Sequence, residues 1–179
     1  LLTLPGRGTR LKGHADAIEL VSDLKARGIP TRLLLLGARQ EGREAYVAEL
    51  ERLAVERGVA DQLAISAQRD DTRDVFAASA LVLQLSNKPE SFGRTVVEAL
   101  CSGRAVVGWN HGGVGELLSR YFPPGMVARW PVDRLLVGSH DRTAVLARPL
   151  GSAARHGHLS DSPGRLRRET TDGPHGHLR

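Results

Sequence analysis

The chain has 179 residues, of which 41% are hydrophobic and 25% charged, as in an ordinary globular domain. Its formal net charge is +5, but the basic surplus lies in residues 128–179, which hold nine arginines against five acidic residues. Only 4% of residues are aromatic, which leaves little surface for stacking bases, so we expect no nucleic-acid partner. The single cysteine excludes an internal disulfide, and no apolar run is long enough to span a membrane. We therefore expect a cytoplasmic protein.

Apolar runs and helical periods alternate along the first part of the chain. Strands are expected at Leu1–Leu4, Thr31–Leu36, Leu63–Ser66 and Ala80–Leu85, and helices at His14–Arg27, Glu41–Arg57 and Thr72–Ser79. This alternation predicts an α/β fold with a doubly wound parallel sheet, whose ligands bind at the carboxyl ends of the strands.

The first loop, Pro5–Gly13, is glycine-rich and basic. Its backbone amides, with the side chains of Arg7 and Lys12, could hold a diphosphate. A solvated basic turn is the alternative that the residue types alone favour.

The segment Ser86–Glu116 reads as a loop, a helix, a strand and a turn. Helical periodicity begins near Phe92 or Gly93 and ends at Gly103, with an apolar stripe that includes Cys101 and predicts it to be core. A buried strand is expected at Ala105–Trp109, followed by a turn at His111–Gly113. Neither His14 nor His111 has an evident partner in the sequence.

Two glutamates, Glu90 and Glu98, bracket this helix. The backbone amides of Ser91, Phe92 and Gly93 at its start are candidates for binding phosphate. Flanking carboxylates would repel phosphate, so they are better suited to accept hydrogen bonds from sugar hydroxyls. The alternatives are that both glutamates are merely exposed and that Phe92 is a core residue.

The stretch Glu90-Ser91-Phe92-Gly93 with Val97-Glu98-Ala99-Leu100, Ser102-Gly103 and Gly112-Gly113-x-x-Glu116 resembles the E-x7-E region of family 4 retaining glycosyltransferases. The pattern Gly6-Arg7-x4-Lys12-Gly13 is similar to that family's first loop. The resemblance covers roughly Leu4 to Val127.

This resemblance implies the Rossmann-like C-terminal, donor-binding domain of a GT-B fold, with the N-terminal domain missing. It implies that Gly6, Arg7, Lys12, Ser91, Phe92 and Gly93 bind the donor, that Glu98 contacts the ribose, and that Glu90 binds the transferred sugar and is catalytic. The partners would be a nucleoside-diphosphate sugar and a saccharide or lipid-linked acceptor. No cofactor or metal would be required, and any peripheral membrane association would run through the missing domain.

Two other functions stay open: a nucleotide-binding module without catalysis, and a GT-B nucleotide-sugar 2-epimerase. We expect residues 1–127 to form the nucleotide-sugar-binding domain, inactive without its other half. Residues 128–179 show almost no periodicity and are expected to be a disordered tail, with a shifted reading frame as one hypothesis for their composition.

Overall fold

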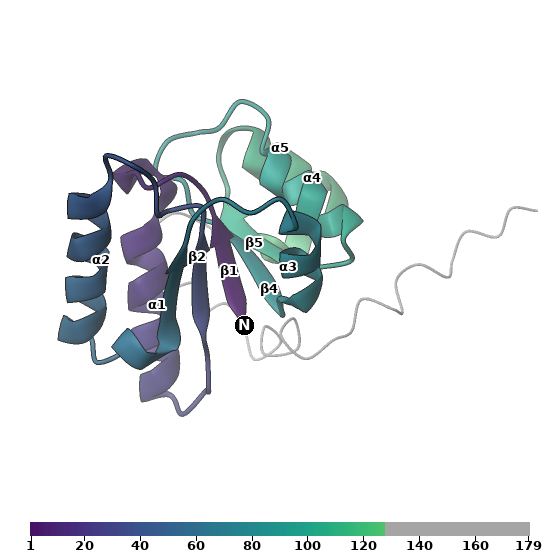
Figure 1. The fold of residues 1–179 in the computed structure, drawn as a ribbon. Coiled ribbons are helices and arrows are strands. Elements are labelled where there is room, and N and C mark those ends of the chain that lie inside the picture. The colour runs from purple at the N-terminus through teal and green to yellow at the C-terminus, as the bar shows by residue number, and fades with distance from the viewer. Residues whose placement is uncertain (128–179) are drawn as a thin grey trace, which may run out of the picture.

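The computed structural model describes residues 1–127 (Figure 1). The expectations for residues 128–179 lie outside this range.

Strands and helices alternate throughout residues 1–127. The strands are β1 (Leu2–Pro5), β2 (Leu33–Leu36), β3 (Leu63–Ser66), β4 (Leu81–Gln84), β5 (Val106–Trp109) and β6 (Met126–Val127). The α-helices are α1 (His14–Ala26), α2 (Glu44–Glu56), α3 (Thr72–Ala78), α4 (Arg94–Cys101) and α5 (Gly112–Tyr121). Three short 3-10 helices are η1 (Arg10–Lys12), η2 (Ala60–Gln62) and η3 (Pro123–Gly125).

The strands form one parallel sheet in the order β3-β2-β1-β4-β5-β6. From β1 the chain winds outward to β3, then returns to lay β4 against the other side of β1 (Figure 1). The strand order therefore reverses between β1 and β4, and at such a reversal the loops at the carboxyl ends diverge and leave a crevice.

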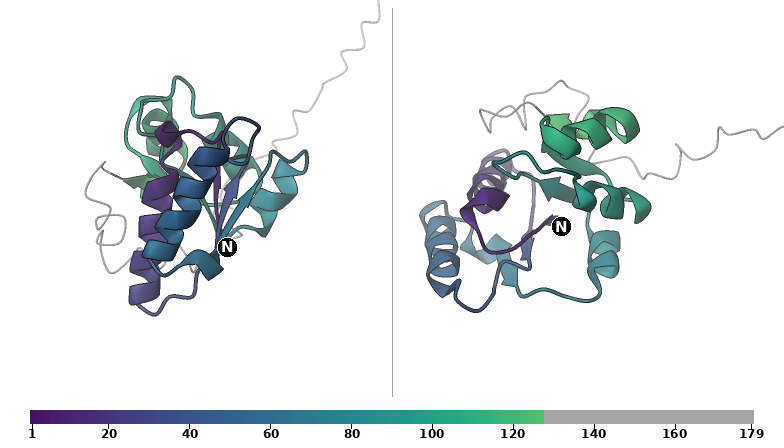
Figure 2. Two further views of the ribbon diagram at one scale, coloured as in Figure 1. Left: turned by 60° about the vertical axis from the view of Figure 1, so that its left-hand side comes forward. Right: turned by 90° about the horizontal axis from the view of Figure 1, so that it is seen from above.

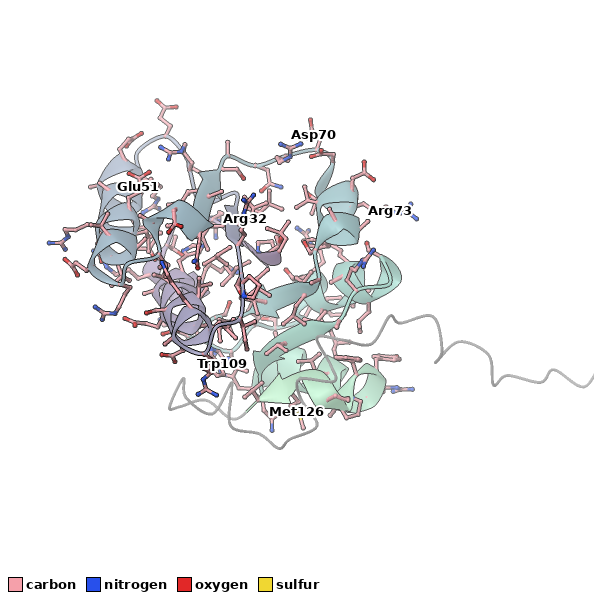
Figure 3. All side chains as sticks on the ribbon, turned by 90° about the horizontal axis from the view of Figure 1, so that it is seen from below. Arg32, Glu51, Asp70, Arg73, Trp109 and Met126 are labelled. Carbon is pink, nitrogen blue, oxygen red and sulfur yellow. The ribbon has the colours of Figure 1, made fainter. Side chains whose placement is uncertain are left out.

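Helices cover both faces of the sheet (Figure 2). Side chains of α1 and α2, such as Ile18 and Leu50, pack with Leu35 and Leu83 in one buried cluster. On the other face, residues of α3, α4 and α5 pack against alternate strand positions: Phe76, Val96, Ala99, Val114 and Leu118 against Leu36, Val82 and Val106. Glu51 on α2 and Arg73 on α3 mark the two sides in Figure 3. Both faces are buried, which explains why the strands are continuous apolar runs.

The predicted doubly wound parallel fold is confirmed. One local prediction is wrong: Gly112 and Gly113 are the first residues of α5 and do not form a turn. A Cβ on Gly112 would lie 2.7 Å from the carbonyl oxygen of Glu90, and one on Gly113 would lie 2.7 Å from the backbone of Phe92. These glycines therefore let α5 pack closely on the backbone of residues 90–92, which explains their presence without a turn. Within residues 1–127, no helix has the length and apolarity needed to cross a membrane.

Candidate functional site

Two loops meet where the strand order reverses. The β1 loop (residues 6–13) and the β4 loop (residues 85–93) are joined by Asn87, whose backbone N–H donates to the Leu11 carbonyl at 2.7 Å and whose side-chain amide donates to the Arg10 carbonyl at 3.2 Å. Gly13 permits this contact, because it has a left-handed backbone (φ 74°) and a Cβ there would lie 2.1 Å from the Leu85 carbonyl oxygen. The geometry thus brings the two predicted ligand-binding loops together.

Lys12 and Glu90, one from each loop, form an ion pair. Lys12 Nζ lies 2.6 Å from Glu90 Oε1, and the two side chains are only 28% and 23% exposed. Ser86 Oγ donates a second hydrogen bond to the same oxygen at 2.5 Å. Burial alone would raise the pKa of Glu90, but hydrogen bonds from Lys12, Ser86 and Gln84 and the charge of Lys12 outweigh it and lower the pKa. Glu90 is therefore held as a carboxylate.

The start of α5 fixes the backbone of the β4 loop. The Gly113 N–H donates to the Glu90 carbonyl at 2.8 Å, and His111 Nε2 lies 3.0 Å from the Ser86 carbonyl. Because a carbonyl can only accept, this contact requires the His111 tautomer that carries its proton on Nε2. His111 thus has a structural partner that sequence reasoning did not find, since the two residues lie far apart in the chain.

His14 is fully buried at the start of α1, directly after the β1 loop. Its Nδ1 lies 3.3 Å from the hydroxyl of Tyr46 on α2. Burial and the nearby charge of Lys12 lower the pKa of His14 to about 4, so the imidazole is neutral at pH 7. This partner, like that of His111, comes from tertiary packing and left no signal in the sequence.

A cavity of about 800 Å³ opens beside the β1 loop, between α3 and α4. Its lining residues are Pro5, Gly6, Arg7, Lys12, Leu36, Gln68, Thr72, Arg73, Phe76, Arg94, Thr95, Glu98, Cys101 and Ser102. Four of these are basic and one, Glu98, is acidic, so the cavity suits an anionic ligand.

The predicted site residues divide between the cavity and its rim. Gly6, Arg7, Lys12 and Glu98 line the cavity. Glu90 reaches it only through its ion pair with Lys12, while Ser91, Phe92 and Gly93 form the turn into α4, with Gly93 as the N-cap. Sequence reasoning missed Arg73 and Gln68 because arginine and glutamine without a motif look like ordinary surface residues.

One alternative, a core position for Phe92, and one expectation, a core position for Cys101, are wrong. Phe92 is 63% exposed and is not a core residue, because the neighbouring Gly93 occupies the inner position against Val114. Cys101 is exposed and lines the cavity, because α4 buries the side that carries Val96 and Ala99.

Glu98 lies on the cavity side of α4 with its side chain 46% exposed. Its Oε1 lies 3.1 Å from Nε of Arg94, one turn earlier in the helix. An exposed pair of this kind is weak, so a ligand can compete for the carboxylate. In residues 1–127, no three His, Cys, Asp or Glu side chains are grouped as metal ligands.

The parallel sheet, with a cavity beside the point where its strand order reverses, is typical of Rossmann-like α/β proteins. The chain therefore has a Rossmann-like fold. The chain belongs to the glycosyl transferases group 1 family, whose model matches residues 1–135.

Several solved structures share this fold. A glycosyltransferase from Rickettsia africae ESF-5 superimposes with a TM-score of 0.72 at 22% identity, covering 87% of this chain and 41% of that one. The Anabaena protein HepE, in complex with UDP and glucose, gives a TM-score of 0.68 at 25% identity, over 83% of this chain and 41% of that one. The C-terminal domain of a glycosyl transferase group 1 family protein from Francisella tularensis gives 0.62 at 19% identity, over 83% of this chain and 80% of that one.

The chain thus spans 41% of the length of the first two of these structures. None of the curated proteins matches it.

Proposed function

We propose that this chain is the donor-binding domain of a family 4 retaining glycosyltransferase and corresponds to the C-terminal half of a GT-B fold. One observation carries the proposal: the cavity at the strand-order reversal combines basic side chains with a single accessible carboxylate, Glu98. Basic side chains can donate charge-assisted hydrogen bonds to a diphosphate, and a carboxylate can accept hydrogen bonds from the hydroxyls of a ribose. The complexes of HepE with UDP and with UDP-glucose support a nucleotide-sugar ligand.

The donor would lie along the cavity from the β1 loop to α4. Arg7 has no ion pair within the described chain and is free to bind phosphate oxygens, with Gly6 allowing close approach of the backbone. Glu98 would accept hydrogen bonds from the ribose. Lys12 lines the cavity and pairs with Glu90, so Glu90 would lie on the phosphate side, next to the sugar that the diphosphate carries.

The start of α4 would complete the diphosphate site. Ser91, Phe92 and Gly93 precede the first turn of α4, where backbone N–H groups and the helix dipole favour an anion. With Arg7 and Lys12 these groups would neutralise the departing diphosphate, so the proposed chemistry needs no metal.

Retention of configuration would follow from attack on the face that the diphosphate leaves. In this mechanism the leaving phosphate takes the proton of the acceptor hydroxyl, while the enzyme supplies positioning and electrostatic stabilisation. Glu90, held ionised by Lys12 and Ser86, would bind the sugar and stabilise positive charge that develops on its ring.

The acceptor site would belong to a second domain facing this one. The match to an isolated C-terminal domain from Francisella tularensis supports this placement. That second domain would hold the saccharide or lipid-linked acceptor and provide any peripheral contact with a membrane. We therefore expect this chain alone to bind donor but not to transfer sugar.

Calorimetric titration with UDP, GDP and ADP tests the proposal. We expect one of the three to bind, and we expect Arg7→Ala and Glu98→Gln each to weaken it at least 10-fold. The matched control is Glu56→Gln, on the exposed end of α2, which should bind as the unmodified chain does. A folded chain that binds none of the three, or binds one regardless of both substitutions, would contradict the proposal.

A further inference from the structure

The two short hydrogen bonds to the Glu90 side chain end on the same carboxylate oxygen. The hydrogen bonds from Lys12 Nζ (2.6 Å) and Ser86 Oγ (2.5 Å) both end on Oε1. Gln84 is a further donor to this carboxylate, but within residues 1–127 the hydrogen bonds from Lys12 and Ser86 are the two of 3.5 Å or less that the Glu90 side chain accepts. The short hydrogen bonds therefore distinguish Oε1 from Oε2.

The two donors to Oε1 differ in what a bound diphosphate would do to them. Lys12 lines the cavity, so its ammonium would be drawn toward phosphate oxygens. Ser86 is neutral and only 4% exposed, so its bond to Glu90 would persist. Without the hydrogen bond from Ser86, the Glu90 carboxylate would rotate away from the diphosphate, because the two are both negatively charged.

The orientation of Ser86 is itself fixed. Its carbonyl accepts a hydrogen bond from His111 at 3.0 Å. Its hydroxyl has one proton, which goes to Glu90, and its lone pairs face the amide nitrogen of buried Gln84 at 3.5 Å. A buried hydroxyl that has both an acceptor and a donor beside it is restricted in its rotamers.

We propose that Ser86 is a positioning residue: it anchors Oε1 of Glu90 so that Oε2 is presented to a hydroxyl of the transferred sugar while Lys12 engages the diphosphate. This inference rests on the proposed function for the identity of the ligand. The anchoring itself does not depend on that ligand and can be measured in the free protein.

The first experiment is a carbon NMR titration of the Glu90 carboxyl in the chain and in three variants. Ser86→Ala removes a donor to the ionised form, so the pKa should rise by at least half a pH unit. Ser86→Thr keeps the hydroxyl, so in this variant Glu90 should have the same pKa as in the unmodified chain. Ser119→Ala removes an exposed hydroxyl on α5 and should change nothing. If Ser86→Ala titrates as the unmodified chain does, the anchoring role is overturned.

The second experiment compares binding of UDP and UDP-glucose by calorimetry. Ser86→Ala should weaken binding of UDP-glucose about 10-fold and binding of UDP less than 2-fold. Ser86→Thr should bind UDP-glucose as the unmodified chain does. An unchanged ratio of the two affinities, whether both fall equally or neither falls, would overturn the inference. Glu98→Gln distinguishes failure of the proposed function from failure of this inference. If Glu98→Gln does not weaken UDP binding, the proposed donor site is wrong. The titration of Glu90 in the Ser86 variants tests the anchoring role without any ligand.

Discussion

Single side chains decide which ligand the cavity can accept. Arg7, Lys12, Arg73 and Arg94 surround it, and Glu98 is the one carboxylate in its lining. A carboxylate in such a setting is unfavourable for binding phosphate, but beside its ion pair with Arg94 it can accept hydrogen bonds from a ligand. A ribose diol can donate such hydrogen bonds.

The pair Arg94–Glu98 provides a prediction at this scale. Because the pair is exposed, with the Arg94 side chain 85% accessible, Arg94→Ala should change the free energy of unfolding by less than about 0.5 kcal/mol. Glu98→Gln should be equally mild for stability, yet weaken nucleotide binding at least 10-fold. Urea unfolding and calorimetry on the same samples check both values. A Glu98 variant that loses stability and binding together would point to a structural role.

His14 makes stability depend on pH. Its pKa is about 4 in the folded chain and about 6.5 when unfolded, so between these values only the unfolded chain takes up the proton. Stability should therefore fall as the pH is lowered, by about 2 kcal/mol between pH 7 and pH 5. Glu90, with its lowered pKa, adds a loss only at more acidic pH, below its ordinary value of 4.5.

Urea unfolding at pH 7 and pH 5 measures the effect of His14. His14→Gln should flatten the dependence between these two values, even if it lowers stability throughout. The same slope in the variant as in the unmodified chain would assign the pH dependence to other groups.

At the scale of elements, α5 holds the β4 loop in place through close backbone contact. Gly113→Ala would put a Cβ 2.7 Å from the backbone of Phe92, and this contact can be relieved only by moving the loop or the helix. We expect a loss of about 1–3 kcal/mol of stability and, because the loop carries Glu90, weaker binding of the nucleotide sugar.

Gly28→Ala is the matched control for Gly113→Ala. Gly28 has a left-handed backbone (φ 72°), a Cβ there would meet no heavy atom within 4 Å, and the residue lies at the far end of α1. This substitution should reduce stability through backbone strain and leave binding unchanged. Thermal unfolding and calorimetry distinguish the two variants, and equal binding losses would contradict the loop-clamping role of α5.

The elements were predictable from sequence to the extent that their patterns are local. Apolar runs placed the first five strands, the glycine-rich segment Pro5–Gly13 located the β1 loop, and Glu90 with Ser91–Gly93 before the helical period located the β4 loop. The start of α5 was mispredicted because two consecutive glycines are typical of a turn. Here Gly112 and Gly113 instead allow close contact with the β4 loop. The partners of His14 and His111, the anchoring by Ser86 and the exposure of Cys101 depend on which helix faces which loop, and a single sequence does not contain this information.

At the scale of the whole molecule, the chain is one Rossmann-like unit of its family, and it covers 41% of the Rickettsia africae glycosyltransferase and of HepE. The cavity opens at the carboxyl edge of the sheet, beside the joined β1 and β4 loops. In the proposed GT-B arrangement, a second domain would close over this edge and bring the acceptor to the sugar. Joining such a domain to this chain should raise transfer from an undetectable rate to a measurable one while changing nucleotide affinity little.

The most direct test of the donor site uses Cys101, the chain's single cysteine, which is exposed and lines the cavity one turn beyond Glu98. The measurement is the rate at which a thiol reagent labels Cys101 with and without saturating UDP, GDP or ADP. The proposed site predicts that the nucleotide that binds slows labelling several-fold, and that Glu98→Gln raises at least 10-fold the nucleotide concentration needed for this protection. Labelling at an unchanged rate while calorimetry shows the nucleotide bound would place the ligand elsewhere and contradict the assignment of this cavity.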